Sequence, residues 1–276
     1  EYSGIKCYPT ANYVNYYGMQ NGYPINDMTK ADAESGYDPT HPWKNRDPRF
    51  YKTIMFDGVK WKSTGGAGGT AELFTGGRES EEANEKKGCF TAYMNSKICP
   101  QLMNTVDGYK ENNIMILSLM RLADVYLMYA EATAVGYNGP KGKAATYSLT
   151  AEEALNKIRE RAGVAPVLDK FLGSTADFLS ELRRERAAEL SFEGFRFIDL
   201  RRWMLLTQYP YTLKTKIEFD RADPSDYNYD EPEENAIKNL REVVLLERKY
   251  TDRHYWYPLP KKDVSMYEGF YQNPGW

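Results

Sequence analysis

The 276-residue chain has few of the residues that usually build metal or redox centres, because it contains only three cysteines and two histidines. Cys7, Cys89 and Cys99 form no C-x-x-C pair, so the sequence encodes no zinc site. Cys89 and Cys99 could pair if two strands brought them together, but we favour free thiols. His41 and His254 lie far apart without carboxylates at ligand spacing. We therefore expect no metal and no cofactor.

The chain also lacks a long apolar run and a basic stripe. Hydrophobic residues make up 42% of the sequence, which is enough for one large core or two modest ones, and no segment reads as a transmembrane helix. A formal charge of −3 argues against a nucleic-acid partner, because such proteins gather Lys and Arg on one face. The partner is expected to be a neutral ligand or another protein.

Motifs for nucleotide binding and nucleophilic catalysis are absent or incomplete. Gly66-x-Gly68-x-x-Ala71 fits a loose dinucleotide pattern, but no buried strand precedes it and Gly76-Gly77 interrupts any helix after it. No G-x-S-x-G sequence occurs, and two isolated histidines leave little room for a catalytic triad. We expect no active site.

The sequence is rich in aromatic residues, which make up 14% of it and include 23 tyrosines. A tyrosine ring buries well and keeps one hydrogen bond to water or a ligand. Most of these rings are expected to pack helices, and only those in loops are candidates for stacking on a sugar.

The composition changes along the chain and indicates a mostly α-helical, irregular domain with long loops and a few short strands. Residues 1–113 are predicted to be loop-rich, with a short helix over 10–17 and a strand over 50–56. Residues 114–206 form the predicted helical core, and residues 207–276 an irregular segment that closes the fold, in which 242–250 could be strand or helix.

Capping signals set the predicted helices of the core. The first begins at Asn113, runs to about Val135, and is apolar around most of its circumference, so it should be central and buried. Thr150 and Glu153 form a capping box for a helix that closes at Gly163. Another helix starts at Ser174 or Thr175 and continues until Gly194, and a last one covers 195–206. Antiparallel pairs of this kind resemble tetratricopeptide units, although no repeat of fixed period is present.

An enzymatic hypothesis would start from four carboxylates in this core, because a glycosidase needs two of them, one kept protonated. Each lies within one or two turns of an arginine, and a nearby guanidinium lowers the pKa of a carboxyl group, the wrong direction for a general acid. We therefore predict a structural ion-pair network of bidentate contacts. Its expected members are Arg121, Glu131, Arg186, Glu189, Glu193, Arg196 and Asp199.

The remaining hypothesis is that the protein binds a sugar by ring stacking. Two stretches of the sequence have the exposed aromatic residues, with polar residues between them, that such a site requires. One runs from Tyr8 to Tyr23, and the other is the glycine-rich excursion bounded by Trp61 and Phe74. The candidate ligand contacts are Tyr8, Tyr13, Asn15, Tyr17, Trp61 and Phe74.

Several blocks, in order along the chain, carry a resemblance to one family. They are NGYPIN at 21–26, GYDPTHPWKNRDPRFYKTIMFDGVKW at 36–61, MRLADVYLMYAEA at 120–132, ALNKIRERAGV at 154–164, ELRRERAAELSFEGFRFIDLRRW at 181–203, YPLPKKDV at 257–264 and QNPGW at 272–276. Together they span almost the whole chain. The sequence resembles the SusD/RagB-like family of outer-membrane nutrient uptake lipoproteins.

The resemblance implies a non-catalytic protein of the Gram-negative cell surface that binds a glycan and delivers it to a TonB-dependent transporter of the SusC type. It also implies that this chain is the C-terminal portion, without the helical N-terminal half and its lipidated cysteine. Two alternatives stay open: a helical adaptor that binds a protein or peptide partner, and a carbohydrate-active enzyme.

Overall fold

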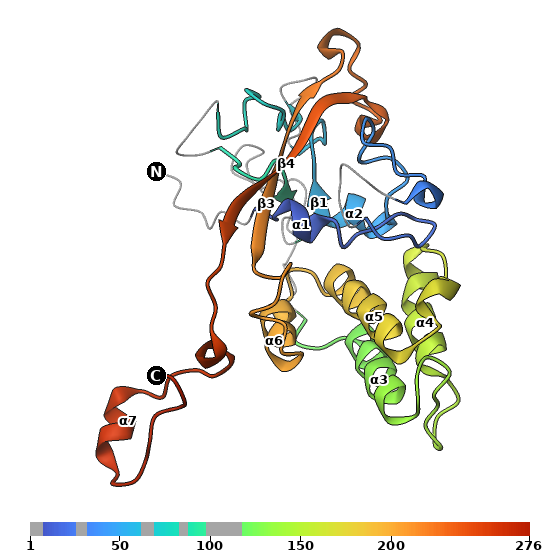
Figure 1. Ribbon diagram of the computed structural model, residues 1–276. Helices are drawn as coiled ribbons and strands as arrows, with labels where there is room; N and C mark the ends of the chain where they lie inside the picture. The colour runs from blue at the N-terminus through green and yellow to red at the C-terminus, as the bar shows by residue number, and fades with distance from the viewer. Residues whose placement is uncertain (1–7, 26–31, 62–68, 83–87, 98–117) are drawn as a thin grey trace.

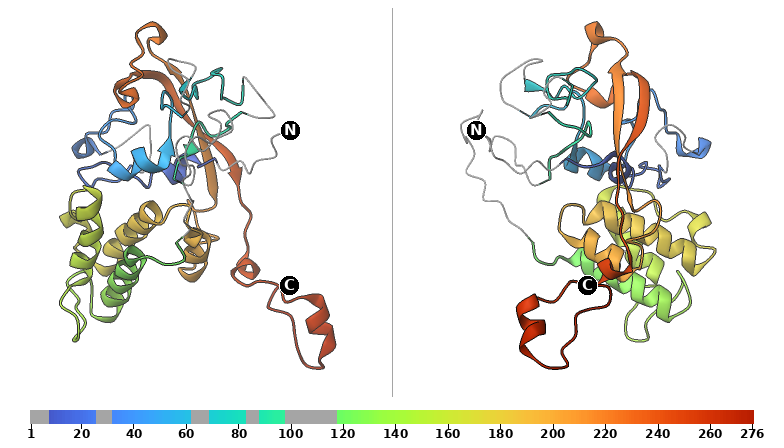
Figure 2. Two further views of the ribbon diagram at one scale, coloured as in Figure 1. Left: turned by 180° about the vertical axis from the view of Figure 1, so that it is seen from behind. Right: turned by 60° about the vertical axis from the view of Figure 1, so that its left-hand side comes forward.

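The computed structural model describes residues 8–25, 32–61, 69–82, 88–97 and 118–276. A strand-bearing part lies above a helical part in Figure 1, and the C-terminal segment extends away from both (Figures 1 and 2). The strand-bearing part is built around a long antiparallel ribbon of β3 (Leu213–Arg221) and β4 (Ile237–Glu247). Leu213 pairs with Glu247 at one end and Arg221 with Ile237 at the other.

Short elements from the first hundred residues cover this ribbon. They are α1 (Ala11–Val14), α2 (Pro48–Thr53), β1 (Ile54–Met55) and β2 (Met94–Asn95), with β1 and β2 forming a second antiparallel pair. Helix α1 packs against β3, where the Asn12 side-chain amide donates to the Leu213 carbonyl over 2.8 Å. The start of the described chain is therefore anchored on an element about 200 residues later.

An aromatic core fills the space between these elements. The Trp43 ring stacks on Phe56 with centroids 5.0 Å apart and meets the edge of Phe219 at 5.2 Å. Phe50 also stacks on Phe56, with the ring centroids 5.2 Å apart. All four side chains are at most 2% exposed, so the strand-bearing part has a complete core of large rings.

The strand predicted over residues 50–56 is wrong for most of its length, since residues 48–53 form α2. Asp47 caps the helix by accepting a hydrogen bond from the Arg49 backbone N–H over 2.9 Å, and Pro48 occupies the first turn. An N-cap aspartate followed by proline is a strong helix start, and here it outweighs the β-rich composition that follows. The chain becomes extended only at Ile54.

The helical part consists of α3 (Leu122–Gly136), α4 (Ala151–Ala162), α5 (Thr175–Glu189) and α6 (Phe195–Arg202). Helix α3 packs against both α4 and α5. The predicted capping box is confirmed, with both Thr150 and Glu153 contacts formed, and Gly163 ends α4 in the left-handed conformation. Ser174 caps α5, which ends at Glu189, five residues before the predicted end at Gly194; α6 also ends four residues before the predicted limit of Leu206.

Helix α3 differs from its prediction in two ways. It begins at Leu122 after an extended Arg121, and the predicted cap Asn113 lies outside the described residues. It is also buried on one face only: Leu122 and Val135 are 66% and 65% exposed. Leu127 and Ala130 lie on the buried face, which packs against α4 and α5, whereas apolar residues elsewhere on the helix, such as Val125 and Met128, are exposed.

The segment after residue 206 is more regular than predicted. Residues 213–221 form strand β3 in place of an irregular arm, and the ambiguous run before Glu247 belongs to strand β4. The chain then passes to α7 (Lys261–Met266). Short 3-10 helices complete the structure at Ala33–Ser35, Asp169–Phe171, Pro224–Asp226, Pro232–Glu234 and Asp252–Tyr255. Over the described ranges, no helix is both long and apolar enough to cross a membrane.

Candidate functional site

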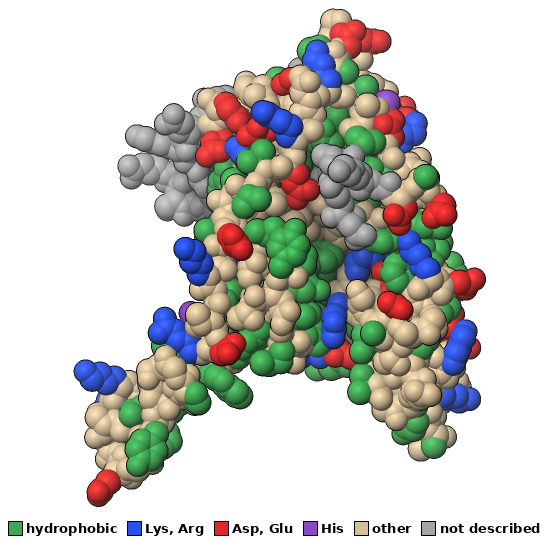
Figure 3. Space-filling model, in the orientation of Figure 1, with side chains coloured by type: hydrophobic (Ala, Val, Ile, Leu, Met, Phe, Trp, Pro, Cys, Tyr) green, Lys and Arg blue, Asp and Glu red, His purple; other side chains and the backbone are tan. Residues whose placement is uncertain are grey.

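A cavity of about 550 Å³ lies where α1 meets α5 and the start of α6. We call it the α1–α5 cavity. In Figure 3, Lys and Arg side chains appear in the hollow between the strand-bearing and helical parts. The residues that line the cavity are Asn12, Asn15, Tyr16, Pro24, Ile25, Lys170, Phe171, Asp177, Ser180, Glu181, Arg183, Arg184, Arg196, Pro210 and Tyr211. Its volume lies within the range of about 300–1,000 Å³ that small-molecule sites occupy.

The polar and aromatic residues of α1 and of the turn that follows it lie on two different faces, as helical spacing requires. Asn12, Asn15 and Tyr16 are three and four residues apart and line the cavity. Tyr13 and Tyr17, also four apart, turn toward α5 and the core. The predicted stretch therefore supplies both ligand-facing and packing side chains, and Asn15 is the predicted contact that reaches the cavity.

The stacking role predicted for Tyr17 is wrong, because its side chain is 0% exposed and its hydroxyl donates to Ser191 Oγ over 2.5 Å. The Tyr13 hydroxyl donates to the Ala187 carbonyl of α5 over 2.8 Å, and its ring meets the edge of Tyr16 at 5.5 Å. Both rings attach α1 to the helical part. Burial raises the pKa of Tyr13 and of Tyr16, so both remain neutral hydrogen-bonding groups at ordinary pH.

Arg196 does not join the ion-pair network in the way predicted. It makes no ion pair with a carboxylate within the described residues. Its guanidinium instead lies over the rings of Tyr16 and Tyr211, 4.6 Å and 5.5 Å from their centroids, and its Nη2 donates to the Tyr16 hydroxyl over 2.6 Å. Gly194, with φ of 87°, turns the chain between α5 and α6 and so directs Arg196 toward α1.

The cavity carries an excess of positive charge, since four cationic and two carboxylate side chains line it. Lys170 pairs with Asp32 at 3.1 Å and Arg184 pairs with Glu181 at 2.5 Å. Arg183 has only a ring contact, 5.3 Å from the Trp203 centroid, and its Nε has no hydrogen-bond partner among the described residues. Arg183 and Arg196 are therefore the cations of the cavity that no described carboxylate compensates.

The lowered pKa of a neighbouring lysine indicates that the electrostatic potential of this region is positive. Burial, together with the charges of Arg248 and Arg196, lowers the pKa of Lys214 to about 8. A lysine whose pKa falls in this way lacks a nearby carboxylate to stabilise its ammonium form.

The other predicted contacts lie outside the α1–α5 cavity. Trp61 is half-buried against the aromatic core, and its backbone N–H donates to the Gly69 carbonyl over 3.0 Å. The Phe74 ring lies under the Arg221 guanidinium at 4.5 Å, and Tyr8 meets the edge of Phe90 at 5.2 Å. None of the three predicted rings lines the cavity that contains Asn15.

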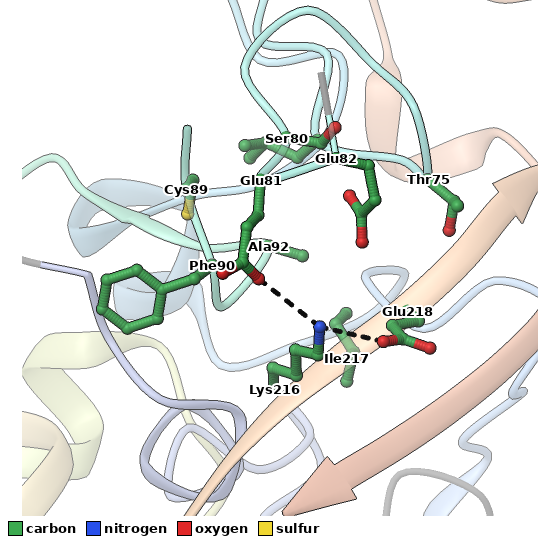
Figure 4. Close-up of a pocket in the computed structure, with 11 residues that line it drawn as sticks. Thr75, Ser80, Glu81, Glu82, Cys89, Phe90, Ala92, Lys216, Ile217 and Glu218 are labelled. Carbon is green, nitrogen blue, oxygen red and sulfur yellow. Dashed lines mark ion pairs between the residues drawn. The ribbon is translucent and has the colours of Figure 1, made fainter. Parts of the chain in front are cut away.

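A second cavity, beside β3, is shown in Figure 4. Its volume is about 10 Å³, which is room for about one water molecule. Lys216 crosses it and pairs with Glu218 at 2.9 Å and Glu81 at 3.6 Å. Cys89, a free buried thiol whose pKa is raised by burial, forms part of its wall. This cavity is too small for a sugar ring. Cys7 and Cys99 lie outside the described residues.

A third hollow of about 630 Å³ runs along the surface of α4. Residues such as Glu153, Lys157 and Glu160 line it, and it contains no aromatic ring. It offers no platform for ring stacking, and we therefore take the α1–α5 cavity, which has both rings and polar side chains, as the candidate site.

The carboxylates of the helical part are paired with cations. Arg121 bonds Glu189 at 2.5 Å and Glu193 at 2.8 Å, and Arg186 bonds Asp124 at 2.5 Å and Asp199 at 2.7 Å. Glu131 pairs with Arg202 at 2.6 Å. Although burial raises the pKa of Glu131, Glu189 and Glu193, the neighbouring cations lower it further, and the net shift is downward. Carboxyl groups in this state are poor general acids.

Sequence reasoning missed the most buried part of this network. Arg159 of α4 bonds Glu185 at 2.9 Å and also pairs with Glu181, and Arg49 of α2 bonds Glu185 at 2.5 Å. The signal was the recurrence of Glu181, Glu185 and Glu189 at four-residue spacing, which places three carboxylates on one face of α5. In the described part of the chain, no three His, Cys, Asp or Glu side chains group closely enough to hold a metal ion.

Comparison with known proteins gave a match to one family model and matches to solved structures. The family model described as the SusD family matches residues 1–276. Among solved structures, a SusD-like protein from Bacteroides fragilis superimposes with a TM-score of 0.68 at 22% identity, covering 97% of this chain and 47% of that one. A SusD superfamily protein from Bacteroides vulgatus gives a TM-score of 0.47 at 21% identity, covering 73% and 34%. No curated protein matches the sequence. The chain thus spans about half the length of the B. fragilis protein, with which it shares the fold.

Proposed function

The chain belongs to the SusD family, and from this premise we propose that it is part of a cell-surface protein that binds a glycan for nutrient uptake. The observation that carries the proposal is the α1–α5 cavity, which combines the rings of Tyr16, Tyr211 and Phe171 with the side chains of Asn15 and Arg196. Sugars present C–H faces that stack on rings and hydroxyl groups that bond amides and guanidinium ions. A cavity of about 550 Å³ accommodates one or two sugar rings.

Binding without catalysis is part of the proposal. Of the two carboxylates that line the cavity, Asp177 accepts a hydrogen bond from Ser174, and Glu181 pairs with Arg184 and Arg159. Burial raises the pKa of Glu181, but the two arginines outweigh this effect and the net shift is downward. A glycosidase would need one carboxyl group with a raised pKa beside the sugar. Glycan hydrolysis by the purified protein, abolished by Glu193→Gln or Asp199→Asn without unfolding, would contradict this part.

The membrane setting is proposed from the family. We infer a lipid-anchored protein at the outer membrane that passes its glycan to a TonB-dependent transporter of the SusC type. The packing of α3 against α4 and α5 supports a further element of the proposal, that these helices are tetratricopeptide-like pairs within a longer helical domain.

Isothermal titration with a panel of neutral and acidic oligosaccharides tests the proposal. We expect binding that weakens about 5-fold or more in Tyr211→Ala, taking for the sugar the range of about 1–3 kcal/mol that stacking of a nucleic-acid base on an aromatic ring contributes. Tyr271→Ala, at an 83% exposed tyrosine in the C-terminal segment, serves as the matched control. Trp61→Ala runs in parallel: loss of binding in Trp61→Ala with full binding in Tyr211→Ala would move the site to the glycine-rich excursion.

One observation favours a second candidate, a helical adaptor for a protein partner. Apolar side chains of α3 and α6 face solvent over the described residues, including Val125, Met128 and Ile198 at 42%, 41% and 58% exposure. Exposed apolar surface of this kind is typical of protein interfaces. Absence of binding to every oligosaccharide tested would favour this candidate.

A further inference from the structure

The positive charge of the α1–α5 cavity indicates which class of glycan it can bind. Of the four cations that line it, Lys170 and Arg184 have carboxylate partners, whereas Arg183 and Arg196 have none within the described residues. The two lining carboxylates are occupied: Glu181 bonds Arg184 and Arg159, and Asp177 accepts from the Ser174 hydroxyl over 2.6 Å. A neutral sugar would leave both free guanidinium charges uncompensated.

Arg196 is held in a manner that suits an anion. Its guanidinium carbon lies over the Tyr16 and Tyr211 rings, 4.6 Å and 5.5 Å from their centroids, and the groups with which it can bond a ligand are its N–H donors. One of these, Nη2, donates to the Tyr16 hydroxyl, and the buried Nη1 has no partner. A buried donor without an acceptor is costly, and an ionised acceptor is the strongest partner it can gain.

Asn15 adds a second kind of contact. It is 6% exposed and lines the cavity, and its side-chain oxygen accepts no hydrogen bond within the described residues. An amide oxygen requires a donor, and a carboxylate cannot supply one. A ligand that satisfies both Asn15 and the arginines therefore carries a hydroxyl group and an acid group together.

We propose that the α1–α5 cavity binds an acidic sugar whose carboxylate is held by Arg183 and Arg196 and one of whose hydroxyl groups donates to Asn15. This inference rests on the proposed function, since it names the class of glycan taken by the same cavity. A planar carboxylate fits the fork of a guanidinium edge, where it accepts two parallel hydrogen bonds.

The test uses two probes with the same sugar backbone: an oligogalacturonate, which is charged, and its fully methyl-esterified form, in which a methyl group replaces the charge of each carboxylate. We expect the acidic form to bind about 10- to 100-fold more tightly, because hydrogen bonds to charged groups contribute about 1.5–3 kcal/mol. The difference should shrink as salt is added. A sulfated neutral oligosaccharide forms the third arm, and tighter binding of the sulfated probe would overturn the carboxylate assignment.

Substitutions of the arginines that line the cavity test whether the preference for the acidic probe arises there. Arg183→Gln is the first choice, because the Arg183 side chain has no hydrogen bond in the described structure whose loss could unfold the protein. It should reduce binding of the acidic probe and leave the ester unchanged. Arg196→Lys keeps the charge but loses the forked pair of N–H donors. It should weaken binding of the acidic probe less than Arg196→Gln does. Arg241→Gln, at a 70% exposed side chain on β4, is the matched control.

Proton uptake gives a second readout that a purely structural role would not move. At pH 8 Lys214 is about half-protonated, because its pKa is lowered to about 8 by burial and by Arg248 and Arg196. An anion beside Arg196 should raise the pKa of Lys214, so that binding takes up protons. Titration in two buffers of different ionisation enthalpy measures this uptake, and binding of the acidic probe without uptake would place the anion elsewhere.

The outcomes separate this inference from the proposed function. Preference for the acidic probe, lost in Arg183→Gln, supports both. Equal binding of both uronate probes, or tighter binding of the ester, overturns the acidic-sugar inference and leaves glycan binding standing. Failure of all three probes and of the wider neutral panel overturns the proposed function and the inference with it.

Discussion

The strand-bearing part and the helical part are stabilised by different means. The first buries large rings, among them Trp43, Phe50 and Phe56, each at most 2% exposed. The second buries alanines where α3 and α4 meet, together with aliphatic residues such as Leu155 and Leu182, and joins its helices through arginine–glutamate pairs. The first part therefore gathers its largest rings in one core, whereas the second joins its helices through buried charge pairs and leaves apolar side chains of α3 and α6 exposed.

The charge pairs of the helical part are deeply buried. Arg159, Glu181 and Glu185 are each at most 2% exposed. Replacing such a pair by apolar residues can be neutral, but removing one partner leaves a buried charge without compensation. The stability of this part should therefore depend on pH in a way that the aromatic core does not.

The largest expected effect is in the aromatic core. Trp43→Ala should lower the free energy of unfolding by about 3–5 kcal/mol, because it removes a fully buried ring that stacks on Phe56 and meets Phe219. Chemical denaturation followed by circular dichroism measures the change. Trp256→Ala, at a 56% exposed tryptophan, should change it by less than about 0.5 kcal/mol. Similar losses in the two variants would contradict a core gathered around Trp43.

The second largest effect is expected at low pH, which should lower the stability of the helical part. Burial raises the pKa of Glu185, but the charges of Arg49 and Arg159 outweigh it and lower the pKa to about 2, from its ordinary value of 4.5. A lowered folded-state pKa contributes stability that is fully present above pH 4.5 and is lost as the pH falls toward 2. Glu185 alone should account for about 3 kcal/mol of this loss.

Denaturation at a series of pH values checks the acid dependence. Glu185→Gln should be less stable than the parent protein at pH 7 and should lose less stability between pH 4.5 and pH 2. Glu160→Gln, at an exposed glutamate of α4, should keep the acid dependence of the parent protein. An unchanged pH dependence in Glu185→Gln would show that the pairs seen around α5 contribute little.

The smallest change in stability is expected on the uncovered face of α3. Val125→Gln with Met128→Gln should change the free energy of unfolding by less than about 0.5 kcal/mol, since both side chains are about two-fifths exposed. The same double variant should reduce self-association in sedimentation velocity, because exposed apolar patches promote it. A loss above 1 kcal/mol would mean that the face is buried in solution.

The sequence allowed local elements to be predicted where the signal was itself local. Helix α4 followed from Thr150, Glu153 and Gly163, because caps act within a few residues. Strand β3 was missed because Thr215 and Arg221 face inward with Ile217 and Phe219, and these two polar residues hid the period-two pattern. Their burial depends on distant partners, such as Asp57 for Arg221.

The candidate site was predicted in part for the same reason. The stretch after Tyr8 was recognised from its composition, and Asn15 does line the cavity. Two of the rings that line it, Tyr16 and Tyr211, both contact Arg196, which lies about 180 residues after Tyr16. Which ring faces a ligand depended on tertiary contacts that no single stretch of sequence contains.

The anchoring of α1 on β3 has a consequence for how the molecule folds. The Asn12 backbone N–H donates to Thr215 Oγ1, and the Ile237 backbone N–H donates to the Thr40 carbonyl, so elements about 200 residues apart complete each other. Contacts of such high sequence separation slow folding, because long loops must close before they form. During synthesis, α1 and the rings around Trp43 must wait for β3 and β4 to emerge from the ribosome. Helices α3 to α5, whose contacts are closer in sequence, can pair before that point.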